Sequence, residues 1–222
     1  YDPSINSCSN DLCLEILEEN TAVITISSFN YYEWNNYAVF KSFLDSSMKV
    51  IENKKIKNLM IDVRYNRGGS QHPSIYLLQH LMDKPFTYYS KVESEGKTSK
   101  TYGEENFHPL DNRFKGKVYF LIDGNGHSTT GHFMSLVKVH NLGTILGEEL
   151  GSNQFCTAGQ TLFRLSNTKF VVSSANNTHV STAITLPDER GILPDFFVTQ
   201  SIDDYLNKVD AVKNYTLKLI RK

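Results

Sequence analysis

Three times along the chain, a short and strongly apolar run is followed by a segment whose apolar residues recur at helical spacing. The apolar runs are residues 22–26, 58–64 and 117–123. The helical patterns that follow them lie within residues 40–51, 74–81 and 133–137. Strands that alternate with helices in this way are the pattern of the α/β class. The sequence therefore predicts an α/β fold.

The second half of the chain predicts a smaller β extension of this core. Further short strands are expected at residues 144–147, 161–165 and 170–173, and a short terminal helix from Ile202 to Leu206. Residues 84–115 are rich in tyrosine and polar side chains, which is typical of an inserted hairpin or a long surface loop. We expect a single domain over residues 1–222, since 40% hydrophobic residues suffice for a sizeable core.

The charge balance and the spacing of potential metal ligands argue against several functions. The 23 Lys and Arg residues face 24 Asp and Glu residues and form no basic patch, so nucleic acid is not an expected partner. No apolar run reaches the roughly 20 residues needed to cross a bilayer. The 7 histidines lack the spacing of an HExxH or paired CxxC site, so no zinc site is expected.

The three cysteines are an odd number and cannot form a complete disulfide framework. Cys8 and Cys13 are close enough in sequence to pair in an oxidising compartment, whereas Cys156 is interpreted as an ordinary buried thiol. The chain opens on Tyr1 and not on Met and a signal peptide. We therefore expect the natural N-terminus to lie upstream.

The third strand-to-helix turn, residues 126–132 with the sequence GHSTTGH, holds the first candidate for chemistry. Ser128 lies at the expected start of the helix, where unpaired backbone N–H groups favour negative charge on a bound carbonyl oxygen. Thr129 would supply one such N–H group. Serine is also a common helix N-cap, so this turn alone does not establish a nucleophile.

The second strand-to-helix turn, residues 62–69 with the sequence DVRYNRGG, ends in a double glycine. Gly68 and Gly69 would let the backbone approach a ligand and direct an N–H group into a cleft. A plain tight turn would have the same sequence. The segment lacks the third glycine and the spacing of a dinucleotide-binding or phosphate-binding loop.

Four segments in this order resemble the catalytic half of the S41 peptidases, the family of the C-terminal processing and tricorn-like peptidases. The family has a D-x-R-x-N-x-G-G segment, a serine at a helix start, a G-E segment and a G-I-x-P-D segment. The matching segments of this chain are residues 62–69, 128–132, 147–149 and 191–195. The resemblance covers residues 22–198, and the form Ser-Thr-Thr-Gly-His is similar to a bacterial branch of the family.

The resemblance implies a crotonase-like ββα spiral core and peptide hydrolysis through an acyl-enzyme, with no metal or organic cofactor. By position, Ser128 would be the nucleophile, and the N–H groups of Gly68 or Gly69 and of Thr129 would form the oxyanion hole. A peptide or protein is the implied substrate. The location implied is secreted, periplasmic or cell-envelope, and an upstream helical or PDZ-like domain is expected to gate access or to supply a base.

The general base has no direct match in the sequence. Processing members of the family use a Lys soon after the G-E segment, but residues 147–154 (GEELGSNQ) contain none. Histidine is the side chain best suited to accept the proton of Ser128 near neutral pH. His132 is the first candidate, because a residue four positions on shares its helical face, and the alternative is a packing role. His72 is the second candidate, and the alternative is that it is simply a polar residue at a helix start.

Three further residues near these motifs have weaker expected roles. His127 is expected to point away from Ser128, which it directly precedes. Glu189 is a candidate to orient a base, although acidic residues in exposed turns are usually only solvated. Glu148 is expected to anchor the loop behind the nucleophile.

Three functions are compatible with these motifs. A serine endopeptidase is favoured by Ser128 together with two sources of oxyanion donors. The alternative is a catalytically silent crotonase-like module that binds a peptide or a hydrophobic small ligand, because the expected Lys is missing and a fold does not dictate chemistry. An ester hydrolase of the α/β-hydrolase type ranks last, since no G-x-S-x-G segment occurs.

Overall fold

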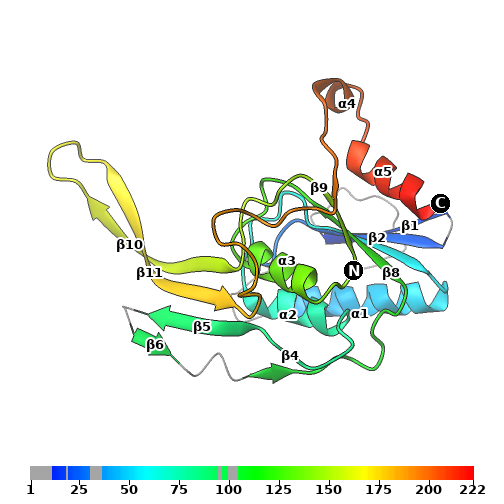
Figure 1. Cartoon of the computed structure of the whole chain (residues 1–222), viewed down its shortest axis with the longest axis horizontal. Helices are drawn as coiled ribbons and strands as arrows, with labels where there is room; N and C mark the ends of the chain where they lie inside the picture. Colours follow the sequence, from blue (N-terminus) through cyan, green and yellow to red (C-terminus); the bar gives the residue numbers. More distant parts are fainter. Residues whose placement is uncertain (1–11, 19, 31–36, 95–96, 100–104) are drawn as a thin grey trace.

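The computed structural model describes residues 12–18, 20–30, 37–94, 97–99 and 105–222. Its main sheet has the strand order β1-β2-β3-β8-β9-β12 (Figure 1). The strands are β1 (Leu12–Leu17), β2 (Thr21–Ile26), β3 (Asn58–Asp62), β8 (Lys117–Ile122), β9 (Thr144–Gly147) and β12 (Phe196–Phe197). From β2 to β12 neighbouring strands run parallel, whereas β1 pairs with β2 antiparallel.

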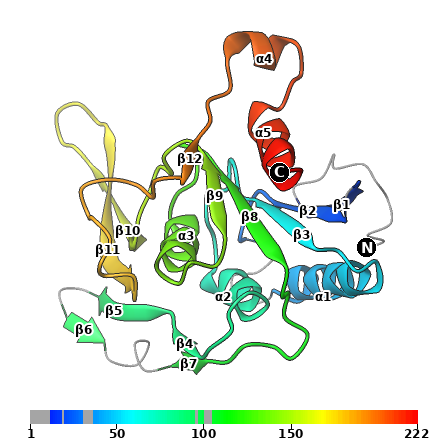
Figure 2. The same ribbon diagram turned by 45° about the vertical axis from the view of Figure 1, so that its right-hand side comes forward.

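Helices cover both faces of this sheet (Figure 2). Three helices, α1 (Ala38–Asn53), α2 (Gln71–Gln79) and α3 (Thr129–Val139), cover one face, and α5 (Ala211–Ile220) covers the other. The alternation of side chains along β8 shows the division, because Phe120 and Ile122 belong to the large core with α1 to α3. Tyr119 and Leu121 point the other way and pack with Val212 of α5.

A second sheet of four antiparallel strands has the order β10-β11-β5-β6. Its strands are β10 (Phe155–Arg164), β11 (Val171–Ser181), β5 (Tyr89–Ser94) and β6 (Lys97–Ser99). The hairpin of β10 and β11 projects from the body of the molecule, and its inner end lies beside α3 (Figure 1). Two short strands, β4 (Phe86–Thr87) and β7 (Asn106–Phe107), form a separate pair.

The predicted α/β class and the smaller β extension are confirmed. Each of the three predicted strand-to-helix steps is present. The helix predicted from Ile202 to Leu206 is α4 (Ile202–Leu206), but α5 follows it, so α4 is not the terminal helix. The strands expected at residues 161–165 and 170–173 form only the outer part of the β10–β11 hairpin. The inner part was not predicted, because it is rich in Thr, Ser and Asn and lacks apolar alternation. The elements β1, β12 and α5 were not predicted either. In α5 only Val212 and Thr216 are buried.

Two predictions concern cysteines and membranes. The proposed pairing of Cys8 with Cys13 involves Cys8, which lies outside the described residues, whereas Cys13 is buried in β1 and disulfide-bonded. Within the described ranges, no helix combines the length and the apolar character needed to cross a membrane.

Arg64, which follows β3, fixes α5 against the main sheet. Its guanidinium donates hydrogen bonds to the carboxylates of Asp62 and Asp210, each at 2.6 Å. Asp210 is also the N-cap of α5, where its side chain accepts from the N–H of Lys213 at 2.9 Å. Burial alone would raise the pKa of Asp210, but the hydrogen bonds and charge of Arg64 lower it overall. One carboxylate thus starts the helix and attaches it to the sheet.

We predict that Asp210→Ala lowers the free energy of unfolding by about 1–2 kcal/mol, because it removes a helix cap and a partly exposed ion pair. Urea unfolding would measure the loss. Asp203→Ala in α4 is the matched control, since that exposed side chain has no described hydrogen bond, and it should change stability by less than about 0.5 kcal/mol. Equal losses in the two variants would contradict the anchoring role of Asp210.

Candidate active site at the start of α3

Ser128 occupies the N-cap position of α3 in a strained backbone conformation. Its φ of 59° and ψ of −127° lie in a region that non-glycine residues rarely adopt and that is concentrated at functional sites. A serine held in a strained strand-to-helix turn is also the device that exposes the nucleophile of α/β-hydrolases. The Ser128 hydroxyl makes no capping hydrogen bond to α3. The plain N-cap interpretation of Ser128 is therefore wrong.

The double-glycine turn packs directly against Ser128, although the two are 60 residues apart. Gly68 has a φ of 86°, and a Cβ atom there would lie 2.7 Å from the Cβ atom of Ser128 and 2.9 Å from the backbone nitrogen of Thr129. Only glycine tolerates both the conformation and this close approach. The two segments that the sequence names as sources of oxyanion donors are therefore in direct contact.

Among the described residues, two backbone N–H groups at this contact have no hydrogen-bond acceptor. The N–H of Gly68 donates to the side-chain oxygen of Asn66 at 2.8 Å, so it is not available to a ligand. In the part of the chain that the structure describes, the N–H of Gly69 has no hydrogen-bond acceptor. Thr129 is the first residue of α3, so its N–H has no acceptor within the helix. The Thr129 hydroxyl also donates to the carbonyl of Gly69 at 2.5 Å and joins the two segments.

The buried side chain of Asn66 holds the elements around Ser128 in place. Its amide donates to the carbonyl of Ile26 at the end of β2 (2.8 Å). Its side-chain oxygen accepts from Gly68 and from the Thr130 hydroxyl, at 2.8 and 2.9 Å. Asn66 thus connects β2, the double-glycine turn and the first turn of α3. The sequence analysis did not single out Asn66, and its place in the D-x-R-x-N segment was the available signal.

The side chain that contacts the Ser128 hydroxyl is Cys156 at the start of β10. Its Sγ atom lies 3.2 Å from Ser128 Oγ, and either atom could be the donor. Cys156 is a free cysteine and is only partly buried, which corrects the prediction of an ordinary buried thiol. Burial raises the pKa of the Cys156 thiol, although the hydrogen bond with Ser128 opposes this in part. The thiol is therefore expected to remain protonated near neutral pH.

His132 does not reach Ser128, which corrects the prediction made from the helical spacing. One ring nitrogen of His132, Nε2, pairs with the carbonyl of His179 at 3.1 Å, and Nδ1 has no hydrogen-bond partner within the described ranges. The ring is fully buried and lies against the ring edges of Tyr88 and Tyr89. Because Ser128 does not have helical dihedral angles, the i+4 rule does not place its hydroxyl beside His132.

The other two histidines named from the sequence lie near the two strand-to-helix turns, His72 in α2 and His127 in the loop before Ser128. His72 is in the first turn of α2, two residues after Ser70, where its ring stacks on Tyr37 and its Nε2 lies 3.3 Å from the amide of Gln71. His127 is exposed, and its Nδ1 pairs with the carbonyl of Asn125 at 2.9 Å. His127 therefore points away from Ser128, as predicted.

The acidic residue that anchors the loop behind the nucleophile is Glu149, not Glu148 as predicted. Glu149 accepts from the N–H of Gly191 at 2.9 Å and pairs with Arg190 at 3.0 Å. Glu148 instead lines a separate cavity. Glu189 is exposed, and its side chain has no hydrogen bond among the described residues. No orienting contact of Glu189 to a histidine is therefore present.

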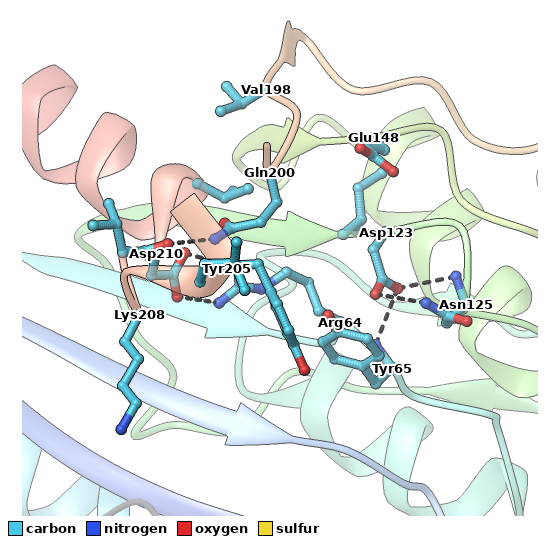
Figure 3. A pocket seen from close by; sticks show the side chains of 14 residues that line it. Arg64, Tyr65, Asp123, Asn125, Glu148, Val198, Gln200, Tyr205, Lys208 and Asp210 are labelled. Atoms are coloured by element: carbon cyan, nitrogen blue, oxygen red, sulfur yellow. Dashed lines mark hydrogen bonds and ion pairs between the residues drawn. The ribbon is translucent and has the colours of Figure 1, made fainter. Parts of the chain in front are cut away.

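This cavity has a volume of about 770 Å³ and lies at the carboxyl ends of β3 and β8 (Figure 3). Its walls include Tyr65 and Asn125, from the two loops that lead to Gly68 and Ser128. Asp123 joins these loops by accepting from the N–H groups of Tyr65 at 3.0 Å and Asn125 at 3.1 Å. Ser128 is not among the lining residues. Over the described ranges, no group of three or more His, Cys, Asp or Glu side chains is arranged to hold a metal ion.

The buried ring of His132 gives the protein a measurable acid sensitivity. Burial lowers the pKa of His132 to about 4, although its hydrogen bond to the His179 carbonyl opposes this. An unfolded histidine titrates near pH 6.5, so the unfolded chain binds the extra proton between pH 6.5 and 4. The stability that His132 contributes is thus complete above pH 6.5 and is lost as the pH falls toward 4.

We predict that His132→Gln reduces the loss of unfolding free energy between pH 7 and pH 5 by about 2 kcal/mol, because glutamine can donate to His179 but does not titrate. Urea unfolding at the two pH values would test this. His127→Gln, at an exposed histidine, is the control and should retain the wild-type loss. An unchanged pH dependence in the His132 variant would show that the ring is solvated.

Comparisons with known proteins agree with the motifs of this site. The sequence profile of Peptidase family S41 matches residues 20–198. No curated protein sequence matches the chain significantly. Several solved structures share the fold, three of which follow. A candidate peptidase from Parabacteroides merdae is 16% identical, with a TM-score of 0.71 over 98% of this chain and 66% of that one. The photosystem II D1 C-terminal processing protease is 13% identical, with a TM-score of 0.58 over 81% of this chain and 42% of that one.

The third is a lipoprotein from Streptococcus agalactiae, 16% identical, with a TM-score of 0.58 over 93% of this chain and 71% of that one. The chain thus spans less than two thirds of the first two structures. At these identities the structures show a shared fold, which confirms the fold implied by the resemblance. The family match extends over most of the chain and includes the double-glycine turn and the turn that holds Ser128. The chain belongs to peptidase family S41.

Proposed function

We propose that the chain is the catalytic domain of a serine endopeptidase that cleaves peptide bonds through an acyl-enzyme on Ser128. The observation that supports this best is the strained Ser128 beside two unused backbone donors, Gly69 and Thr129. A strained residue costs of order 1–3 kcal/mol, and the hydroxyl it presents is not used as a helix cap. Such a cost is expected where the hydroxyl must face a substrate.

The reaction follows from these positions. Ser128 Oγ attacks the carbonyl carbon of the scissile bond and loses its proton to a base. The carbonyl oxygen becomes an oxyanion, which accepts from the N–H groups of Gly69 and Thr129. The leaving amine takes up the proton, and water then hydrolyses the acyl-enzyme by the same route. The Thr129 hydroxyl on the Gly69 carbonyl keeps the two donors at a fixed separation.

His72 is the residue we propose as the proton acceptor. It lies in the first turn of α2, which begins directly after the turn that packs on Ser128. Its Nδ1 atom has no hydrogen bond among the described residues, and catalytic hydrogen bonds often tighten only when substrate is bound. We do not propose His132 for this role, because its Nε2 atom is hydrogen-bonded to the His179 carbonyl.

A cell-envelope or secreted location and a peptide or protein substrate belong to the same proposal. The disulfide at Cys13 is typical of an oxidising compartment, and one protein of the same fold is a lipoprotein. Peptide substrates are the substrates of the family to which the chain belongs. An upstream domain that controls access would account for the greater length of the related structures.

A catalytically silent binding module is the second candidate, and one observation favours it. Among the described residues, no Lys, His, Asp or Glu side chain hydrogen-bonds to Ser128 Oγ, whose partner is a protonated thiol. Covalent labelling separates the two candidates, since a binding module has no activated hydroxyl.

We predict that wild-type protein reacts covalently with a fluorophosphonate and that Ser128→Ala does not react and does not hydrolyse peptides. Intact-mass spectrometry would locate the adduct. Ser135→Ala is the matched control, because Ser135 lies on the same helix but donates to the carbonyl of His132 away from the double-glycine turn. Labelling of the Ser128→Ala protein at the wild-type rate would place the nucleophile elsewhere, and an unreactive wild type would favour the binding module.

We predict that His72→Gln slows this labelling by about 100-fold or more, which is the usual contribution of a general base. His132→Gln is the matched variant and should label within about threefold of wild type, because its ring is engaged at the His179 carbonyl. A time course of labelling, with quenched samples analysed by mass spectrometry, gives both rates. If His132→Gln labels much more slowly than His72→Gln, the base would be assigned to His132.

A further inference from the structure

We propose that the outer edge of β10 next to Ser128 binds the substrate as an added β-strand, so that an extended and uncharged peptide segment pairs with residues 155–158. The term substrate rests on the proposed function. The binding mode itself rests on the hydrogen-bonding pattern of β10, its position and its composition.

The first observation is that β10 is the end strand of its sheet. The order is β10-β11-β5-β6, and within the described part of the chain no strand pairs with the other edge of β10. Antiparallel partners alternate between hydrogen-bonded and non-hydrogen-bonded pairs. Ser181 donates to the carbonyl of Gln154 at 3.0 Å, which makes that pair a bonded one. Counting along the register, Cys156 and Ala158 bond to β11, whereas Phe155 and Thr157 direct their backbone groups outward.

The outward groups closest to Ser128 are the Phe155 carbonyl and the Thr157 N–H. The N–H of Phe155 is occupied, because it donates to the side chain of Asn153 at 3.0 Å. Thr157 is exposed, and its outward N–H has no acceptor among the described residues. A strand added in either direction would accept a hydrogen bond from this N–H. Thr157 is therefore the central group of the proposed pairing.

The position of this edge fits a substrate better than another occupant. Cys156, which directly precedes Thr157, contacts the Ser128 hydroxyl at 3.2 Å. The side chain of Cys156 lies on Ser128, and the backbone N–H of the exposed Thr157 points outward from the free edge of the same strand. A peptide paired with Thr157 would thus run past the nucleophile. A second copy of the protein on the same edge would obstruct it.

The composition of the edge defines the chemistry of the peptide. Residues 155–163 contain no charged side chain, and Phe155 is 41% exposed. Natural edge strands usually carry lysine, proline or other devices that prevent pairing with another strand, and none occurs between residues 155 and 158. Gly159, with a φ of 64°, interrupts the regular strand directly afterwards. The binding stretch is therefore short and suits an uncharged or apolar segment.

Hydrogen exchange on Ser128→Ala protein tests the pairing without turnover. The probe is a blocked peptide of alanine and valine residues without charged side chains, measured by NMR against the same peptide with its backbone amides N-methylated. In the free protein, the Thr157 amide should exchange fast and those of Cys156 and Ala158 slowly. The unmodified peptide should slow exchange at Thr157 by at least about tenfold, as expected for one new backbone hydrogen bond. Peptide binding without protection of Thr157 would overturn the proposal.

A pair of variants with intact Ser128 tests the same edge in catalysis. Thr157→Pro removes the outward donor but no bond to β11, and it should lower kcat/KM for uncharged peptides about tenfold. Leu162→Pro is the matched control: Leu165 donates to the Phe170 carbonyl at 2.9 Å, and counting back along the register makes Leu162 an outward position of the same strand beyond Gly159. It should stay within about threefold of wild type. Equal effects of the two variants would contradict the proposed stretch.

The outcomes distinguish this inference from the proposed function. Protection of Thr157 by the peptide, with no hydrolysis by any variant, would support the binding mode and contradict the catalytic proposal. If Thr157→Pro leaves kcat/KM for peptide hydrolysis unchanged and the peptide does not protect the Thr157 amide from exchange, the catalytic proposal is supported and the binding mode is contradicted. If sedimentation shows that Thr157→Pro converts a dimer to a monomer while peptide binding is unchanged, the edge is a contact between copies and the inference is wrong.

Discussion

The hydrogen bonds of the buried Asn66 side chain are the interaction on which the arrangement around Ser128 depends. A buried amide has both a donor and an acceptor to satisfy, and leaving either unpaired costs of order 1–3 kcal/mol. Asn66 satisfies its groups with the Ile26 carbonyl, the Gly68 N–H and the Thr130 hydroxyl. These partners come from three separate segments, so satisfying one side chain fixes the relative positions of β2, the double-glycine turn and α3.

That arrangement has consequences for which groups are available at the site. Because Asn66 occupies the N–H of Gly68, the unused donor of the turn is Gly69. Because Gly68 packs against Ser128 without a side chain, the serine can occupy a strained turn and present its hydroxyl toward β10. The strain at Ser128 and the conformations of the two glycines are thus maintained by packing and hydrogen bonds that surround them.

The two sheets have different structural roles around Ser128. The main parallel sheet, with α1 to α3 on one face and α5 on the other, fixes the strand ends from which the two turns emerge. The second sheet brings Cys156 and the His179 carbonyl against α3 and leaves one of its own edges unpaired. The contact between α3 and the second sheet, through the buried ring of His132, therefore aligns the projecting hairpin with the nucleophile. A histidine that looked catalytic in the sequence is a structural link between α3 and β11.

The alternation of strands and helices, the two strand-to-helix turns and the candidate nucleophile could all be predicted from the sequence. These features are local, since periodicity, glycine pairs and a serine at a helix start are set by neighbouring residues. Three features could be seen only in the folded chain: Gly68 touches Ser128, the free donor belongs to Gly69, and Cys156 rather than His132 contacts the hydroxyl. Each of these is a contact between segments distant in sequence, or depends on a dihedral angle that those contacts impose. Helical spacing could not exclude His132, because the rule assumes helical geometry at Ser128 and the turn does not have it.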